Sequence, residues 1–175
     1  MRIIGLAGWS GSGKTTLLTK VLPRIVARGF RVSTVKHAHH AFEVDQPGKD
    51  SHTHRLAGAT EVLVASERRF ALIHELRQES EPRLPDLLAK LAPVDLVIVE
   101  GYKREPHPKL EVFRDAVGKP LLHPDDPHIV AIASDVALPH AKVPRVRLDD
   151  TGAIIDLLLA HAAVFAPAAR RPGGA

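Results

Sequence analysis

A glycine-rich segment near the N-terminus constrains the fold of this 175-residue chain more than any other feature. Residues 8–15, GWSGSGKT, match the pattern GxxxxGK(S/T); they follow a strand-like run at 2–7 and precede a segment of helical spacing at 14–28. A phosphate-binding loop (P-loop) requires this strand–loop–helix context. The sequence therefore predicts that the phosphates of a nucleoside triphosphate are held by Gly8, Trp9, Ser10, Gly11, Ser12, Gly13, Lys14 and Thr15.

The chemistry of polyphosphate binding explains the residue types in this loop. Glycines allow successive backbone N–H groups to curl around phosphate oxygens, and the helix N-terminus favours negative charge. We expect the Lys14 ammonium to lie against the β- and γ-phosphates and the Thr15 hydroxyl to enter the coordination shell of Mg²⁺. Thr16 is suited to the α-phosphate.

The order of the apolar runs predicts an α/β fold. Strand-length runs alternate with helical segments, which is typical of a mostly parallel, helix-covered sheet and, with the P-loop, of a three-layer P-loop NTPase fold. Three residues separate the runs 60–66 and 70–74, too few for a helical crossover, so they predict an antiparallel hairpin that gives the sheet a mixed edge. The predicted strands are 2–7, 31–36, 60–66, 70–74, 94–99, 110–113, 128–133 and 145–148.

The length of the chain predicts one nucleotide-binding domain over residues 1–165. Its last element is a buried helix at 151–165 that begins with a capping threonine. Residues 166–175 contain prolines, glycines and two adjacent arginines without an apolar period, and this composition predicts a flexible tail.

The composition argues against several classes of protein. The chain carries 24 Lys and Arg and 20 Asp and Glu, for a net charge of +4, and it has five Phe, one Trp and one Tyr to stack on bases, so we expect no nucleic-acid partner. The absence of cysteine excludes disulfides and thiolate metal sites. No apolar run approaches the roughly 18 residues that span a bilayer, and the N-terminus does not resemble a secretory signal, so we expect a cytoplasmic protein without a membrane partner.

A carboxylate at the end of another buried strand is needed to hold Mg²⁺ opposite the P-loop. The run 94–99 is followed by Glu100, at the carboxyl end where ligands bind in open parallel sheets. Asp95 lies at the other end of the same run and is expected in a loop. We therefore assign Glu100 as the metal-side carboxylate and, together with Lys14, as a catalytic residue.

The segment that follows the strand at 31–36 is rich in cations and imidazoles. Because Lys36 ends that strand at the sheet edge of the P-loop, we expect the segment to overhang the phosphates and to hold a second anionic ligand. A metal site is the sharper alternative, because neutral imidazole suits zinc, nickel and copper. Its candidate ligands are His37, His39, His40, His52 and His54, whose spacing also fits a solvated loop. Asp50 and Ser51 have a structural use as the N-cap of a short helix that ends at Gly58.

Three segments of the chain are distinctive together. They are GWSGSGKTTL, KHAHHAFEVDQPGKDSHTHRLAGA and DLVIVEGYKREPHPKLEVFR, which span residues 8 to about 114. In these segments the chain resembles the molybdopterin-guanine dinucleotide biosynthesis protein B (MobB) family. The middle segment carries the resemblance most strongly, because many NTPase families share the P-loop.

The resemblance implies a dimeric GTP-binding protein. Its partner would be the molybdopterin guanylyltransferase, which attaches GMP to molybdopterin to give the guanine dinucleotide form of the molybdenum cofactor. By the same resemblance, Lys14, Thr15 and Thr16 bind nucleotide and Mg²⁺. The other motif residues would face the phosphates or the pterin: Lys36, His37, Asp45 and Asp50 in the second segment, and Glu100, Gly101 and Lys103 in the third.

Guanine recognition has no obvious motif in this chain. The (N/T)KxD element of ordinary GTPases is missing, and the nearest substitute is Asp135, which ends the run ASD at the same sheet edge. Asp135 is our candidate reader of the base; an Asx turn that starts a loop explains it equally well.

Several functions remain compatible with these residues. The first is a GTP-binding accessory protein with slow hydrolysis, because no arginine finger or water-positioning glutamine occurs in an obvious motif. A nucleotide-gated scaffold without catalytic duty has the same sequence features. A small-molecule kinase would need a lid over the phosphates, for which 67–69 is the only cluster. A metal-delivery protein would use the histidine segment.

Overall fold

The computed structural model describes residues 1–38 and 42–165 in two compact units. The first unit comprises residues 1–37 and 84–165, and the second begins at Ala38 and ends at Arg83. The sequence alone predicted one domain over residues 1–165. Residues 166–175, predicted as a tail, and His39 and His40 lie outside the described residues.

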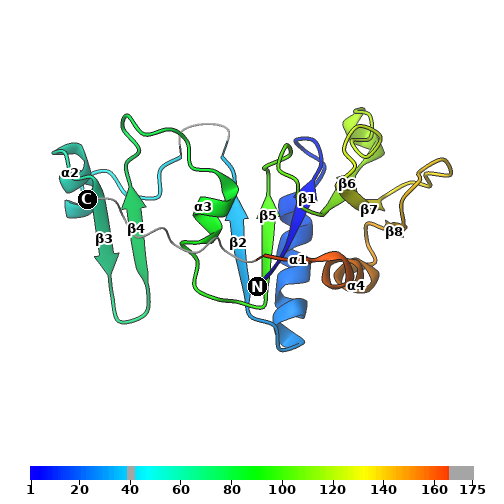
Figure 1. Ribbon diagram of the computed structural model, residues 1–175, viewed down its shortest axis with the longest axis horizontal. Coiled ribbons are helices and arrows are strands. Elements are labelled where there is room, and N and C mark those ends of the chain that lie inside the picture. Colours follow the sequence, from blue (N-terminus) through cyan, green and yellow to red (C-terminus); the bar gives the residue numbers. More distant parts are fainter. Residues whose placement is uncertain (39–41, 166–175) are drawn as a thin grey trace. The chain divides into compact units, whose positions relative to one another are not determined.

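A seven-stranded sheet forms the centre of the first unit, with the order β2-β5-β1-β6-β7-β8 along its main path (Figure 1). The strand β9 pairs with β1. All strand pairs on the main path are parallel, and β9 is antiparallel to β1. The strands are β1 (Arg2–Ala7), β2 (Val32–Lys36), β5 (Leu96–Glu100), β6 (Lys109–Phe113), β7 (Ile129–Ser134), β8 (Arg145–Arg147) and β9 (Ala163–Val164).

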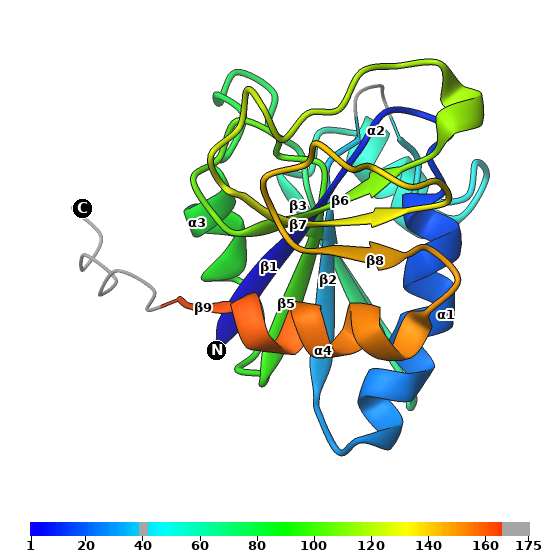
Figure 2. The same ribbon diagram turned by 90° about the vertical axis from the view of Figure 1, so that its right-hand side faces the viewer.

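Apolar residues are buried on both faces of this sheet, as its parallel topology requires. On one face, α1 (Lys14–Ala27) and α4 (Thr151–His161) pack side by side (Figure 2), and Leu17, Val21 and Leu158 belong to the core there. A second core cluster contains Leu84 and Leu88 of α3 (Leu84–Leu88). These observations confirm the predicted α/β fold with a mostly parallel sheet.

The C-terminal helix is shorter than the sequence predicted. Helix α4 ends at His161, and the next residues form β9, which pairs with the start of β1. The helix-length apolar run could not reveal this change, because aliphatic residues suit both a buried helix and a buried strand. The predicted threonine cap is also wrong: Asp150 is the N-cap, and its side chain accepts a hydrogen bond from the N–H of Ala153.

The second unit contains α2 (Asp50–Leu56) and a hairpin of β3 (Glu61–Ala65) and β4 (Phe70–His74). The antiparallel pairing is confirmed, but the hairpin is a separate two-stranded sheet and not an edge of the main sheet. A short connection determines how two strands pair and carries no information about a third strand. The mixed character of the main sheet comes from β9 instead.

Two short helical segments were not predicted. Helix α3 and the 3-10 helix η1 (Asp115–Val117) contain five and three residues, too few for a hydrophobic period to show. Among the helices of residues 1–38 and 42–165, none is long and apolar enough to cross a membrane.

Candidate nucleotide site

The P-loop connects β1 to α1 and depends on glycine at two positions. Gly8 has φ 141°, and a Cβ atom there would lie 2.5 Å from the carbonyl oxygen of Val112 in the neighbouring strand. Gly13, the N-cap of α1, has φ 90°, in the left-handed region that side chains disfavour. The loop can therefore pass closely over β6 and enter the helix only with these residues.

The first turn of α1 presents backbone donors at the end of this loop. None of the described side chains caps the helix at Gly13, and the first N–H groups of any helix have no partner within it. Thr16 lies in the same turn. Backbone amides and the positive end of the helix dipole together suit an anion.

The Lys14 side chain folds back over the loop. Its Nζ donates hydrogen bonds to the carbonyl oxygens of Gly8 and Trp9, both at 2.9 Å. Burial lowers the pKa of Lys14; Glu100 opposes this shift, and Lys36 and Lys103 add to it. Lys36 and Lys103, which were also predicted to face the phosphates, are therefore close enough to Lys14 to repel its positive charge.

Thr15 and Glu100 meet as the sequence predicted. Thr15 Oγ1 lies 3.2 Å from Glu100 Oε1 and 3.5 Å from Oε2, and donates to the carboxylate. Strand pairing explains this proximity. Glu100 is the last residue of β5, and it pairs with Leu6 of β1 on one side and with Lys36 of β2 on the other. A hydroxyl beside a carboxylate at the mouth of a P-loop is a set of hard oxygen donors that fits Mg²⁺.

The other predicted residues near Glu100 make close contacts through both backbone and side chains. The N–H of His37 donates to the carbonyl oxygen of Glu100 at 2.9 Å, and the His37 ring lies 4.8 Å from that of Tyr102. Gly101 has φ 95°, and a Cβ on it would lie 2.6 Å from His37 Cβ. Lys103 places its Nζ 4.8 Å from the centre of the Trp9 ring. The structure thus brings together the predicted residues of the P-loop, the end of β2 and the end of β5.

Asp135 follows β7 and borders a pocket of about 170 Å³. Its Oδ1 accepts a hydrogen bond from the N–H of Asp115 at 3.0 Å, which ties Asp135 to the segment after β6 and is not an Asx turn. Arg114 and Arg147, which were not among the predicted site residues, also line this pocket. The pocket is lined by Lys20, Arg114, Ser134, Asp135, Arg147, Leu148 and Asp149.

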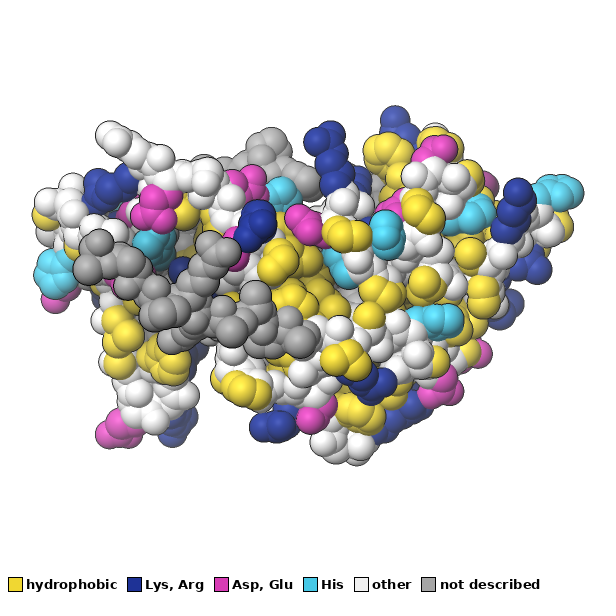
Figure 3. All heavy atoms as spheres, viewed as in Figure 1, with side chains coloured by type: hydrophobic (Ala, Val, Ile, Leu, Met, Phe, Trp, Pro, Cys, Tyr) yellow, Lys and Arg dark blue, Asp and Glu magenta, His cyan; other side chains and the backbone are white. Residues whose placement is uncertain are grey.

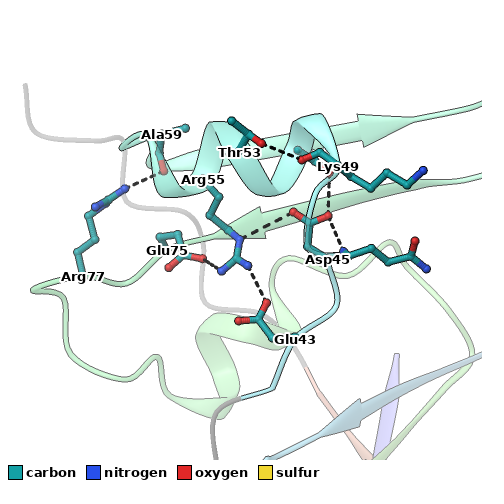
Figure 4. Close-up of polar contacts among 10 residues, drawn as sticks. Glu43, Asp45, Lys49, Thr53, Arg55, Ala59, Glu75 and Arg77 are labelled. Carbon is teal, nitrogen blue, oxygen red and sulfur yellow. Dashed lines mark hydrogen bonds and ion pairs between the residues drawn. The ribbon is translucent and has the colours of Figure 1, made fainter.

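Asp45 and Asp50 belong to the second unit, in which Asp45 takes part in an internal polar network (Figure 4). Asp45 Oδ1 accepts hydrogen bonds from Ser51 Oγ at 2.7 Å and from the Gln46 N–H at 3.0 Å. The helix α2 begins at Asp50, so Lys49 is its N-cap in place of the predicted Asp50 or Ser51, and Ser51 donates to Asp45 instead.

Arg55 is the centre of this network. Its guanidinium contacts Glu43 at 2.6 Å and Glu75 at 2.9 Å, and its Nε lies 3.9 Å from Asp45. Three carboxylates from separate segments therefore converge on one cation. The two hydrogen-bonded carboxylates raise the pKa of Arg55.

The residues proposed for the kinase lid and for the metal site can be located in the structure. The kinase lid candidate at 67–69 forms the turn between β3 and β4, where the Ser66 N–H donates to the carbonyl oxygen of Arg69 at 2.8 Å. Within the part of the chain that the structure describes, no group of three or more His, Asp or Glu side chains could hold a metal ion; His39 and His40 fall outside that part.

Comparisons with known proteins identify the family of this chain and several of its relatives. A model of the family described as "MobB: Molybdopterin guanine dinucleotide synthesis protein B" matches residues 3–135. The "Molybdopterin-guanine dinucleotide biosynthesis adapter protein" of Escherichia coli (strain K12) is 41% identical over 160 residues, 90% of this chain and 91% of that protein. The protein of the same name from Haemophilus influenzae is 41% identical over 150 residues, 84% of this chain and 80% of that protein. A crystal structure of molybdopterin-guanine biosynthesis protein B superposes with a TM-score of 0.72 and 28% identity, over 90% of this chain and 98% of that one.

Proposed function

Because the chain belongs to the molybdopterin guanine dinucleotide synthesis protein B family, we propose that it is a cytoplasmic GTP-binding adapter of molybdenum cofactor biosynthesis. In this role it assists a molybdopterin guanylyltransferase in attaching GMP to molybdopterin. In this role the protein binds GTP together with Mg²⁺ and hydrolyses the GTP slowly.

The meeting of Thr15 with Glu100 carries the proposal. The two residues are far apart in the sequence, yet the hydroxyl and the carboxylate lie 3.2 Å apart beside the N-terminus of α1. A structural P-loop turn without a ligand has no need for a carboxylate at this point. Mg²⁺ held by Thr15 and Glu100 would neutralise charge on the β- and γ-phosphates.

The residues of the chain have distinct tasks in this scheme. Lys14 exchanges its hydrogen bonds with Gly8 and Trp9 for the β- and γ-phosphates. Lys36 and Lys103 add positive charge toward the phosphates or the pterin. Asp135 accepts hydrogen bonds from N1–H and the amino group of guanine at the pocket beyond β7.

The proposed adapter is a homodimer, as the family resemblance implies. The β3–β4 hairpin exposes Leu63, Phe70 and Leu72, with Phe70 74% exposed, and hydrophobic side chains are visible over these strands in Figure 3. A two-stranded sheet needs further packing to be stable in water, and α2 packs against β3 but leaves these side chains exposed. A second copy that covers this apolar surface would stabilise it, and sedimentation of a Leu72→Lys variant as a monomer would support this contact.

Titration with GTP tests the proposed function. Trp9 is the only tryptophan and lies in the P-loop, so its fluorescence reports binding directly. We expect Mg²⁺–GTP to bind the wild type and not Lys14→Ala, because no other side chain of the motif supplies that cation. The matched control is Lys90→Ala, which removes an exposed lysine. Unchanged affinity in Lys14→Ala, or a tenfold preference for ATP over GTP (about 1.4 kcal/mol), contradicts the proposal.

A further inference from the structure

Arg114 lies between the P-loop and the pocket beside Asp135. It directly follows β6, and its Nε and Nη2 atoms are 3.4 and 3.5 Å from the position that a Cβ atom on Gly13 would take. Its Nη1 lies 3.8 Å from Asp135 Oδ2, and the residue lines the pocket of about 170 Å³. One guanidinium thus borders the start of α1 and the proposed base site.

This position is electrostatically unfavourable for a cation. The N-terminus of α1 carries the positive end of the helix dipole, which attracts anions and repels cations. Asp135 compensates only in part, since 3.8 Å is longer than a charge-assisted hydrogen bond and its other oxygen accepts from the Asp115 N–H. A negatively charged ligand at this point would relieve the repulsion.

The location also limits which part of a nucleotide Arg114 can face. Lys14 Nζ lies against the carbonyl oxygens of Gly8 and Trp9 and is assigned above to the β- and γ-phosphates. Arg114 lines the pocket assigned to the base. A cation between these two places faces the phosphate nearest the nucleoside.

We propose that Arg114 binds the α-phosphate of the guanine nucleotide and that its guanidinium links the P-loop to the base pocket. This inference rests on the proposed GTP binding. It predicts that Arg114 contributes equally to the affinities for GTP, GDP and GMP, because the α-phosphate is common to all three. Lys14, in contrast, contributes most to the affinity for GTP.

Nucleotide titrations of Arg114→Ala, followed by Trp9 fluorescence, test this role. We expect a similar loss of affinity, about 10- to 100-fold, for GTP, GDP and GMP, as for one charge-assisted hydrogen bond. Arg114→Lys should recover part of this affinity, because it keeps the charge and loses the planar fork. The matched control is Arg28→Ala: Arg28 is 41% exposed at its side chain, close to the 42% of Arg114, and is paired with Asp156.

The outcomes separate this role from a structural one and from the proposed function. A purely structural Arg114 would lower the melting temperature without nucleotide and leave the three affinities within twofold of the wild type, which overturns the inference. A loss confined to GTP also overturns it, because Arg114 would then face the γ-phosphate. If Arg114→Ala does not fold, the same comparison with Arg114→Lys decides. Wild-type protein that binds no guanine nucleotide contradicts the proposed function itself, together with this inference.

Discussion

His107 makes the stability of this protein depend on pH in a predictable direction. The residue is 6% exposed, and neither ring nitrogen has a hydrogen-bond partner among the described residues. It packs closely over β1, where a Cβ on Gly5 would lie 2.5 Å from its Nε2. Burial, and to a smaller extent the neighbouring Lys109 and His128, lower the pKa of His107 to about 4, against a partial opposing effect of Asp126.

The sign of the effect follows from this lowered pKa. An unfolded chain binds a proton at His107 near pH 6.5, whereas the folded chain resists protonation until about pH 4. The free energy of unfolding therefore falls as the pH drops from 6.5 to 4 and is unaffected by this group above 6.5. A difference of about 2.5 pH units corresponds to roughly 3 kcal/mol, at 1.36 kcal/mol for each unit.

Urea unfolding at pH 7 and at pH 4 measures this contribution. We expect the free energy of unfolding to fall by roughly 3 kcal/mol more in the wild type than in His107→Asn, which cannot titrate. Glu111, whose pKa is raised mainly by burial, shifts stability in the opposite direction, but it is present in both proteins and cancels in the comparison. His140→Asn, at an exposed position, is the control. Equal decreases in the wild type and His107→Asn would refute a buried, neutral His107.

Three further predictions test the site and the core. Glu100→Gln should reduce Mg²⁺-dependent GTP turnover more than GTP affinity, because the loop amides still bind the phosphates. Equal losses of turnover and of affinity would contradict the assignment of Glu100 to Mg²⁺. Gly8→Ala should destabilise the protein more than Gly11→Ala in urea unfolding. Both residues have positive φ, but only at Gly8 would the added Cβ lie 2.5 Å from a carbonyl oxygen, and equal losses of stability would contradict this reason. Leu158→Ala should cost about 2–5 kcal/mol in the same assay, because Leu158 is fully buried between α4 and the sheet, and a loss below 1 kcal/mol would contradict that packing.

Local patterns were sufficient to predict the fold class and the centre of the candidate site. The P-loop carries its own geometric requirements, so its position after β1 and before α1 followed from the sequence. Glu100 could be placed beside Thr15 because parallel strands bring their carboxyl ends to one edge. Lys36 could be placed there by the same rule.

Contacts between distant segments were not predictable from local patterns. Arg114 ends the third distinctive segment, but nothing in that segment marks it as a neighbour of Gly13, because this proximity depends on how β6 packs beside β1. Asp45 lies in a distinctive motif, yet its Oδ1 accepts hydrogen bonds from Ser51 and Gln46 within the second unit. Sequence reasoning recognised its motif but could not distinguish a ligand-binding carboxylate from one that holds a loop.

The sequence of β6 suggests an exposed face that the strand does not have. Its sequence KLEVF alternates charged and apolar residues, which is typical of a strand with one exposed face, yet Lys109 is 1% and Glu111 0% exposed. The buried charges are satisfied, because Lys109 donates to Asp126 at 3.1 Å and Glu111 accepts hydrogen bonds from the N–H groups of Leu122 and His123.

These buried charges of β6 position the segment that supports the P-loop. Glu111 holds Leu122 and His123, and two residues before Leu122 the carbonyl oxygen of Pro120 accepts a hydrogen bond from the Trp9 indole at 2.8 Å. A carboxylate in the middle of a strand thus fixes a loop that in turn contacts the phosphate-binding turn. Because Glu111 accepts two backbone hydrogen bonds that no apolar residue could replace, its burial stabilises the geometry of the site and not only the core.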